Sequence, residues 1–190
     1  AYGFSWIISD IDPNYTLGDM ARKRQEIIKR LKEEGVFDLN KQLDLPLFSQ
    51  RIAVISSKSA AGYGDFANQL YGNQYGYYFE AELFAATMQG EDVERSIIKA
   101  LNAINDRCDD FDCVVIIRGG GATSDMSGFD ALELAENVAN FPLPIITGIG
   151  HDRDECILDM VSHTRVKTPT AAAALLIDNL HTAERRIDDA

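Results

Sequence analysis

The sequence predicts an α/β domain built on a mainly parallel sheet. Three short apolar runs rich in β-branched residues, each followed by a turn of small residues, support this fold class: Arg51–Ser56, Cys113–Ile117 and residues 145–147. Continuous apolar runs of this length are typical of strands buried on both faces of a sheet. The recurring order of strand, turn and helix favours parallel strands joined by right-handed crossovers.

The composition indicates a globular protein that acts away from membranes. The chain has 190 residues, of which 46% are hydrophobic, enough for one core with attached pieces. No apolar run is long enough to cross a bilayer, and the three cysteines lack the CxxC spacing, so a reducing cytoplasm fits best. A net charge of −12 argues against broad non-specific binding to nucleic acid.

The first fifty residues predict a strand, a helix and a connector. Residues 2–11 alternate apolar and polar side chains, as a half-buried strand does. Thr16 is the candidate N-cap of a helix that ends at Gly35, and residues 40–50 form a polar connector in which we place a domain boundary. The chain begins in an apparent strand and ends in an apparent helix, so we expect a piece of a longer protein.

The middle of the chain predicts two helices around a second strand. Small residues at 57–65 lead into a helix at residues 66–70, and residues 77–86 have strand character. The tyrosines within residues 71–78 are expected to be half-buried core residues, with stacking on nucleobases as the alternative. Apolar residues at helical spacing between positions 93 and 104 predict the next helix.

The last third predicts a further strand between helices. A helix is expected at residues 130–140, before the strand at 145–147. Asp159 and His163 are four residues apart on the next expected helix and could form a metal pair, although this is a weak ligand signal. Thr168 is the candidate N-cap of a last helix, and Pro169 is its candidate first residue. From residue 175 onward, the spacing of the apolar residues suits the start of a coiled coil.

A basic residue and three glycines follow the central apolar run. Arg118 stands at the end of that strand, and Gly119, Gly120 and Gly121 can bring bare backbone N–H groups close to an anion. Ligands of open α/β sheets bind outside the carboxyl ends of the strands, so this turn predicts a site for a phosphate-like group. The alternative is a tight connection between strand and helix.

Candidate catalytic side chains come from all three turns. Asp65, Arg118, His151 and Asp154 would meet at one edge of the sheet as a histidine, two carboxylates and an arginine. Together they make an acid/base and phosphate-clamping set, whereas each alone has a purely structural explanation such as a capping acid or a surface cation. The rival function is a Rossmann-like module that binds a phosphate or nucleotide without catalysis, but G-x-G-x-x-G and a Walker lysine are both absent.

Four segments, taken in order, resemble the large subunit of bacterial exodeoxyribonuclease VII. The family patterns S-P-T-G-A-A-x-x-D, G-R-G-G-G-S, G-H-E-T-D and A-P-T-P-S-A-A-A correspond here to SKSAAGYGD at 57–65, IRGGGA at 117–122, GHDRD at 150–154 and VKTPTAAA at 166–173. The departures include Lys58 for Pro, Ala60 for Gly, Ile117 for Gly and Ala122 for Ser. The four candidate catalytic side chains are all kept.

The resemblance implies a domain layout and a function. It places Asp65, Arg118, His151 and Asp154 on the family's catalytic positions. It implies the end of an OB-fold at residues 1–12, a helical connector at 13–50, a three-layer, Rossmann-like catalytic α/β domain at 51–174, and the start of a long helical region at 175–190. The implied activity is hydrolysis of single-stranded DNA from either end, together with a small subunit and with no required divalent metal.

Overall fold

The protein is an α/β domain with a parallel sheet at its centre. A computed structural model describes residues 13–59, 61–119, 126–150 and 155–189, with side chains from residue 17 onward. The described residues form a sheet of five strands in the order β2-β1-β3-β4-β5, in which every neighbouring pair is parallel. The strands are β1 (Arg51–Ser56), β2 (Glu80–Ala85), β3 (Cys113–Ile117), β4 (Ile145–Gly148) and β5 (Thr164–Arg165).

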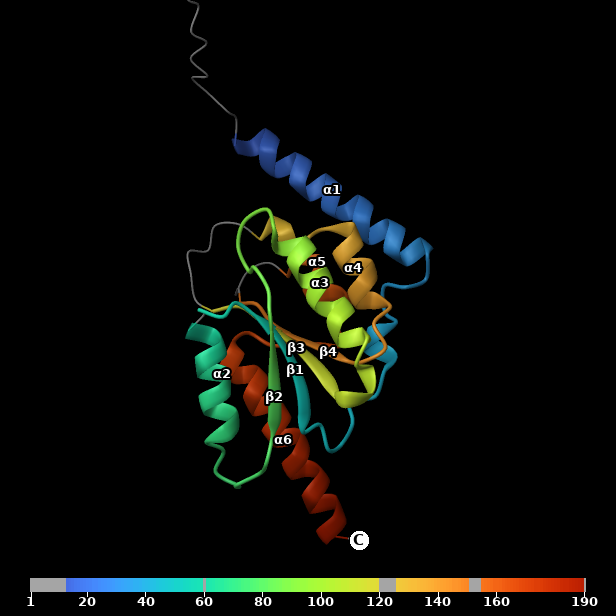
Figure 1. The fold of residues 1–190 in the computed structure, drawn as a ribbon. Helices are drawn as coiled ribbons and strands as arrows, with labels where there is room; N and C mark the ends of the chain where they lie inside the picture. The colour runs from blue at the N-terminus through green and yellow to red at the C-terminus, as the bar shows by residue number, and fades with distance from the viewer. Residues whose placement is uncertain (1–12, 60, 120–125, 151–154, 190) are drawn as a thin grey trace, which may run out of the picture.

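Helices cover both faces of the sheet and complete three layers (Figure 1). One face carries α2 (Ala61–Tyr71) and α6 (Pro169–Asp188). The other carries α1 (Pro13–Glu33), α3 (Val93–Asn105), α4 (Leu132–Ala139) and α5 (Ile157–Val161). Three short 3-10 helices lie in the connections: η1 (Asn40–Gln42), η2 (Cys108–Asp110) and η3 (Ser127–Phe129). No described helix is both long and apolar enough to pass through a bilayer.

The two-residue period of the strands divides the core between the two faces. In β1, Ile52 and Val54 pack with α2 and α6, whereas Ala53 and Ile55 pack with α3 and α4. The central strand β3 alternates in the same way, and all five of its residues are buried. Burial on both faces explains why these strands read as continuous apolar runs.

The strand order fixes where a ligand can bind. The chain passes from β1 outward to β2 and then returns to β3 on the other side of β1. The connection after β1 therefore leads to α2 on one face and the connection after β3 leads to α4 on the other face. Open α/β sheets bind ligands at the carboxyl edge where connections diverge in this way. The sequence predicts the site at this edge.

The predicted fold class is confirmed, and so are two helix boundaries. Gly35 follows α1 with a φ of +73°, the left-handed conformation of a helix stop. Thr168 caps α6 by accepting a hydrogen bond from the Ala171 amide at 3.1 Å, and Pro169 is the first residue of that helix. The predicted strand at residues 2–11 lies outside the described residues.

Two predicted helix starts are wrong. The first helix begins at Pro13, so Thr16 lies inside it and is no N-cap, and proline at a first helical position explains the earlier start. The helix predicted at residues 66–70 begins earlier, at Ala61. It contains Gly62 despite the low helix propensity of glycine, because no larger residue fits beside Gly119. Asp65 therefore lies in the second turn of α2.

The tyrosines at 71–78 are more exposed than predicted. Tyr71, Tyr75 and Tyr78 are exposed, so the core prediction is wrong for these three, and Tyr77 is half-buried. Tyr75 stacks on His181 of α6 with ring centroids 4.1 Å apart. The strand predicted at residues 77–86 is shorter than expected and begins at Glu80.

The segment that follows α1 is joined to the amino end of the sheet. Asn40 is fully buried, and its amide nitrogen donates to the carbonyls of Phe141 and Leu143 at 3.2 and 2.9 Å. Its side-chain oxygen accepts from the Ile145 amide at the start of β4, at 3.0 Å. Ile27 and Leu31 of α1 are buried in the same cluster as α3, α4 and α5. The domain boundary within residues 40–50 stays a prediction.

We expect Asn40→Ala to destabilise the protein strongly. The substitution leaves buried backbone groups of three residues without their side-chain partner, and each buried unsatisfied group costs about 1–3 kcal/mol. Urea unfolding would measure the loss. Asn137→Ala is the matched control, because it removes one exposed hydrogen bond to Glu133 and should change stability by less than about 0.5 kcal/mol. Equal effects of the two substitutions would contradict this account.

Candidate active site

Three separate segments touch at the carboxyl edge of the sheet. A Cβ atom added to Gly62 in α2 would lie 2.6 Å from the Gly119 Cα, 2.8 Å from its nitrogen and 2.9 Å from the Pro169 Cγ. Real side chains do not tolerate such distances to backbone atoms, so only glycine fits at position 62. The first turn of α2, Gly119 after β3 and the start of α6 therefore meet at one point.

The end of β4 reaches the same region. A Cβ atom added to Gly148 would lie 3.1 Å from both the Thr168 carbonyl oxygen and the Ile117 Cγ2. Gly150 follows with a φ of +81°, next to the carbonyl of Lys167. The segment that precedes α6 thus packs against the end of β4, beside the paired end of β3, which brings together described parts of all four segments on which the family resemblance rests.

Arg118 is held at the end of β3 on the face covered by α3 and α4. Its amide donates to the Gly148 carbonyl at 3.2 Å, which extends the pairing of β3 with β4 by one residue. Its Nη1 lies 3.0 Å from the Met126 Sδ, and only 6% of the residue is exposed. A permanently charged guanidinium is therefore placed in a low-dielectric setting, where its interactions with charges are stronger than in water.

Asp65 lies on the opposite face, in a polar groove between α2 and α6. The groove has a volume of about 540 Å³ and is lined by Asp65, Asn68, Gln69, Tyr75, Thr170 and Asp178 among others. Asp65 is one helical turn beyond Gly62 and is exposed. Arg118 and Asp65 consequently belong to segments in contact but approach the edge from the two faces of the sheet.

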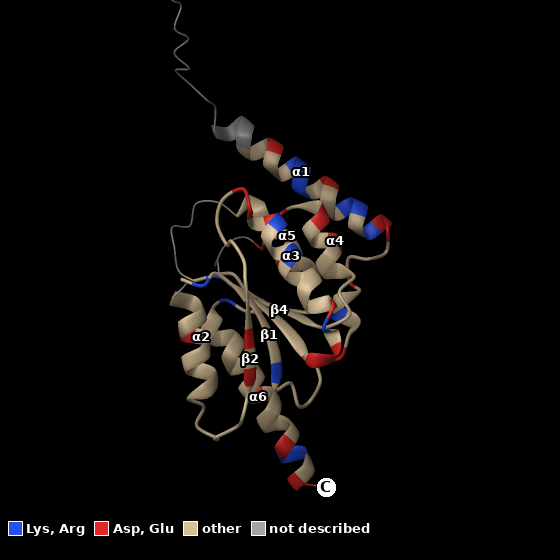
Figure 2. Ribbon diagram, in the orientation of Figure 1, with Lys and Arg blue, Asp and Glu red and all other residues tan. Residues whose placement is uncertain are grey.

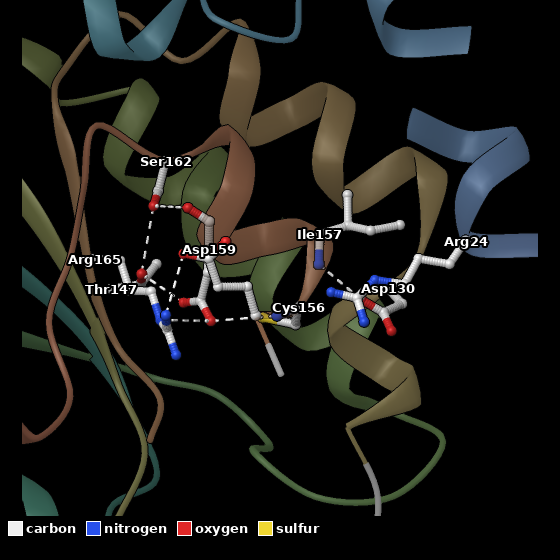
Figure 3. A network of polar contacts seen from close by, with 9 residues as sticks. Arg24, Asp130, Thr147, Cys156, Ile157, Asp159, Ser162 and Arg165 are labelled. Carbon is white, nitrogen blue, oxygen red and sulfur yellow. Dashed lines mark hydrogen bonds and ion pairs between the residues drawn. The ribbon is translucent and has the colours of Figure 1, made fainter. Parts of the chain in front are cut away.

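His151, Asp154, Gly120 and Gly121 lie outside the described residues, so their predicted roles remain predictions. The elements on either side of 151–154 are joined by a buried network (Figure 3). Asp159 of α5 accepts from the Thr147 hydroxyl of β4 at 2.7 Å.

The network continues around the Asp159 carboxylate. Its second oxygen accepts from the Cys156 amide at 3.4 Å and lies 3.6 Å from the Arg165 Nε. The Ser162 hydroxyl donates to the Asp159 carbonyl at 2.9 Å. These contacts fix the end of β4 relative to the start of α5, the two elements between which residues 151–154 lie.

The predicted pairing of Asp159 with His163 is wrong. The helix α5 ends at Val161, so the two residues do not share a helical face. The ring nitrogens of His163 instead lie 2.7 Å from the Thr164 hydroxyl and 2.8 Å from the Leu43 carbonyl. Within the described parts of the chain, no group of three or more His, Cys, Asp or Glu residues could hold a metal ion. The four-residue spacing was misleading because the helix proved only five residues long.

Asp130 also supports the start of α5. Its carboxylate accepts from the Ile157 amide at 2.7 Å and lies 4.0 Å from the Arg24 Nε of α1, as Figure 3 shows. Burial raises the pKa of Asp130 above its ordinary value, and the Ile157 hydrogen bond and the Arg24 charge oppose this rise. The sequence offered no signal for Asp130 beyond a polar residue at the start of a helix.

We expect Gly62→Ala and Gly64→Ala to have opposite effects on stability. The Cβ at position 62 meets backbone atoms that cannot move aside, so the substitution should lower the unfolding free energy by about 1–3 kcal/mol. Position 64 has no atom within 4 Å of an added Cβ, so alanine should raise helix stability by about 0.5–1 kcal/mol. Chemical denaturation of both variants tests this, and a neutral Gly62→Ala would exclude the close approach.

The raised pKa of Asp130 predicts a pH-dependent stability difference. A carboxyl whose pKa is higher in the folded state binds its proton more tightly there, so folding loses stability as pH rises through that range. Asp130→Asn keeps an acceptor for the Ile157 amide and does not titrate. Its unfolding free energy, relative to the wild-type protein, should therefore increase as pH rises above about 4. Urea unfolding at several pH values would show this, and a constant difference would contradict it.

The chain was compared with protein families and with known proteins. The family described as "Exonuclease VII, large subunit" matches residues 36–190. The exodeoxyribonuclease 7 large subunit of Deinococcus radiodurans is 37% identical over 191 residues, which cover all of this chain and 46% of that protein. The proteins of the same name from Clostridium botulinum strain Hall and Nostoc sp. are 35% and 36% identical, over 85% and 86% of this chain and 39% of each relative.

A solved structure of a 3-dehydroquinate dehydratase-like protein from Bifidobacterium longum is also similar, with a TM-score of 0.41 and 14% sequence identity. The match covers 69% of this chain and 95% of that protein. At this level the similarity says nothing about function. The sequence relatives are more informative, although the chain spans less than half of their length. On the family match and these identities, the chain belongs to the exonuclease VII large-subunit family.

Proposed function

We propose that this chain contains the catalytic α/β domain of an exodeoxyribonuclease that hydrolyses phosphodiester bonds of single-stranded DNA from either end, yielding oligonucleotides. Membership of the exonuclease VII large-subunit family supports the nuclease activity. The observation that carries the proposal is the contact between Gly62 and Gly119. It joins the helix with Asp65 to the turn that follows Arg118, at the crevice where open α/β sheets bind ligands.

The phosphate would be held by the turn after β3. Arg118 and the backbone amides of residues 119–121 supply a guanidinium and N–H donors, which suit the oxygens of a phosphodiester. The negative charge on these oxygens is redistributed as water attacks phosphorus. Donors fixed in place before the reaction stabilise that transition state without reorganising. The packing of Gly119 against Gly62 supports such a fixed geometry.

Proton transfer would fall to the side chains of the other two turns. A water oxygen forms a bond to phosphorus while the bond to the leaving oxygen of the sugar breaks. His151 would accept the proton of the water or give one to the leaving oxygen, and Asp65 or Asp154 would orient the imidazole or activate the water. In this scheme the cationic groups neutralise the charge of the phosphate, and no divalent metal is required.

The proposed partners follow from the family. We infer a small subunit that assembles with the helical region from residue 175 onward, and single-stranded DNA as substrate. The residues Ala172, Ala173, Leu176, Ile177 and Leu180 of α6 are buried against the sheet, so the helix joins the catalytic domain directly to that region. All three cysteines are free thiols, which is consistent with the proposed cytoplasmic location.

Arg118→Ala should reduce the nuclease activity of the complete natural protein, with any co-purifying subunit, by about 100-fold or more in kcat. Degradation of a labelled single-stranded oligonucleotide, with EDTA or with added Mg²⁺, would measure it. Arg30→Ala is the matched control, because Arg30 is an exposed residue of α1 paired with Glu34 at 2.9 Å, and its loss should leave the rate unchanged. Wild-type rates for Arg118→Ala would exclude the proposed site.

The same assay separates the enzyme from a phosphate-binding module. A protein that binds oligonucleotides but releases no product under any metal condition would be a binding module without catalysis. Activity that EDTA abolishes and Mg²⁺ restores would contradict the metal-independent scheme but not the nuclease activity.

A further inference from the structure

We propose that a second groove, between β2 and α3, binds a nucleotide unit of the DNA strand that enters or leaves the catalytic site. This proposal rests on the proposed function and assigns it a new substrate-binding surface. We call this surface the lysine groove and define it by Lys58, Phe84, Ala85, Lys99, Ala100 and Ala103. Its volume of about 480 Å³ is within the range of sites that bind small ligands, about 300–1,000 Å³.

The lining of the lysine groove has the chemistry of a nucleotide site. Lys58 and Lys99 are exposed and supply two ammonium groups, and none of the described residues that line the groove is acidic. Between the lysines lies an apolar surface of alanines and the half-buried ring of Phe84, which Phe111 supports edge-on at a centroid distance of 5.6 Å. Ammonium groups suit phosphates, and an apolar and aromatic surface suits the face of a base.

The lysine groove is connected to the catalytic edge through packed residues. Arg118 contacts Met126 through its Nη1, and two residues later Gly128 lies against Val93, the first residue of α3. The Ser96 hydroxyl on the next turn donates to the Val93 carbonyl and accepts from the Thr87 amide, which fixes the connection after β2 along the groove. Lys58 follows β1 directly after Ser57, at the carboxyl edge itself.

Charge distinguishes the lysine groove from the polar groove between α2 and α6. The polar groove contains the carboxylates of Asp65 and Asp178, which repel phosphates. In Figure 2, acidic residues lie along β2 and in the loop that follows it, and basic residues also lie in loops at the carboxyl edge. On a chain of net charge −12, a polyanionic strand gains most from a groove that two cations line and no acidic residue lines. The strand should therefore follow the face of α3.

Salt-dependent binding tests this proposal directly. The complete natural protein, with any subunit that co-purifies, would be titrated with fluorescent oligothymidylate at several salt concentrations. Each phosphate contact contributes about 0.7 to the slope of log K against log salt for a single strand. Lys58→Ala and Lys99→Ala should each reduce the slope by about 0.7 and weaken binding several-fold. Lys41→Ala, at the opposite edge of the sheet, should leave the slope unchanged.

A second pair of variants blocks the groove without removing a lysine. Ala103→Glu places a carboxylate in the groove at an exposed helical position, so it should weaken oligothymidylate binding at least as much as one lysine substitution. Asn102→Glu adds the same charge at the adjacent exposed position of α3, which faces a different surface depression, and should have a smaller effect. Circular dichroism would confirm that all variants are folded.

The outcomes separate this proposal from the proposed function. Wild-type protein that neither binds nor cuts the oligonucleotide would contradict the nuclease assignment. The lysine groove alone would be overturned if the wild-type protein binds and cuts but the other variants show no groove effect. That result would be an unchanged salt slope for both lysine variants, and equal effects of Ala103→Glu and Asn102→Glu on binding. Reduced slopes for Lys58→Ala and Lys99→Ala, with Lys41→Ala unchanged, would establish it.

Discussion

The approach of Gly62 to Gly119 determines how the carboxyl edge of the sheet is built. Because a helix and a turn meet there backbone to backbone, no side chain separates the segment with Asp65 from the segment with Arg118. Pro169 completes the contact and places the start of α6 against both. Packed interiors transmit displacements of a few tenths of an ångström, so a change in any of these segments shifts the other two. The geometry of the edge thus depends on tertiary packing more than on the turn sequences themselves.

The fold was predictable because its strands are strongly patterned. The runs that became β1, β3 and β4 are buried on both faces, and that burial requires the continuous apolar residues that identify them in the sequence. The start of α2 was not predictable in this way. The glycines of this segment are typical of a loop in the sequence. Only the close approach to Gly119 explains why position 62 of the helix is a glycine. The two-residue strand β5 was too short to produce any pattern.

The candidate site was predictable in part for a related reason. Parallel strands open their turns at one edge, so the order of the motifs was enough to predict that their segments converge. The supporting residues were not predictable, since Asp159 and Asp130 act through backbone amides and distant partners that no spacing reveals. The lysine groove was missed for the same reason, because Lys58 and Lys99 are 41 positions apart in the printed sequence and only the path of the sheet brings them to one surface.

The buried amide of Asn40 has a consequence for how the molecule responds to force. It joins the segment after α1 to the backbone at the start of β4, while Leu31 anchors α1 itself in the core. The helix and the strand therefore belong to one cooperative unit that opens as a whole. A pull on α1 would therefore act on the start of β4 through the Asn40 side chain. The segment after α1 is thus mechanically coupled to the start of β4 through the side chain of Asn40.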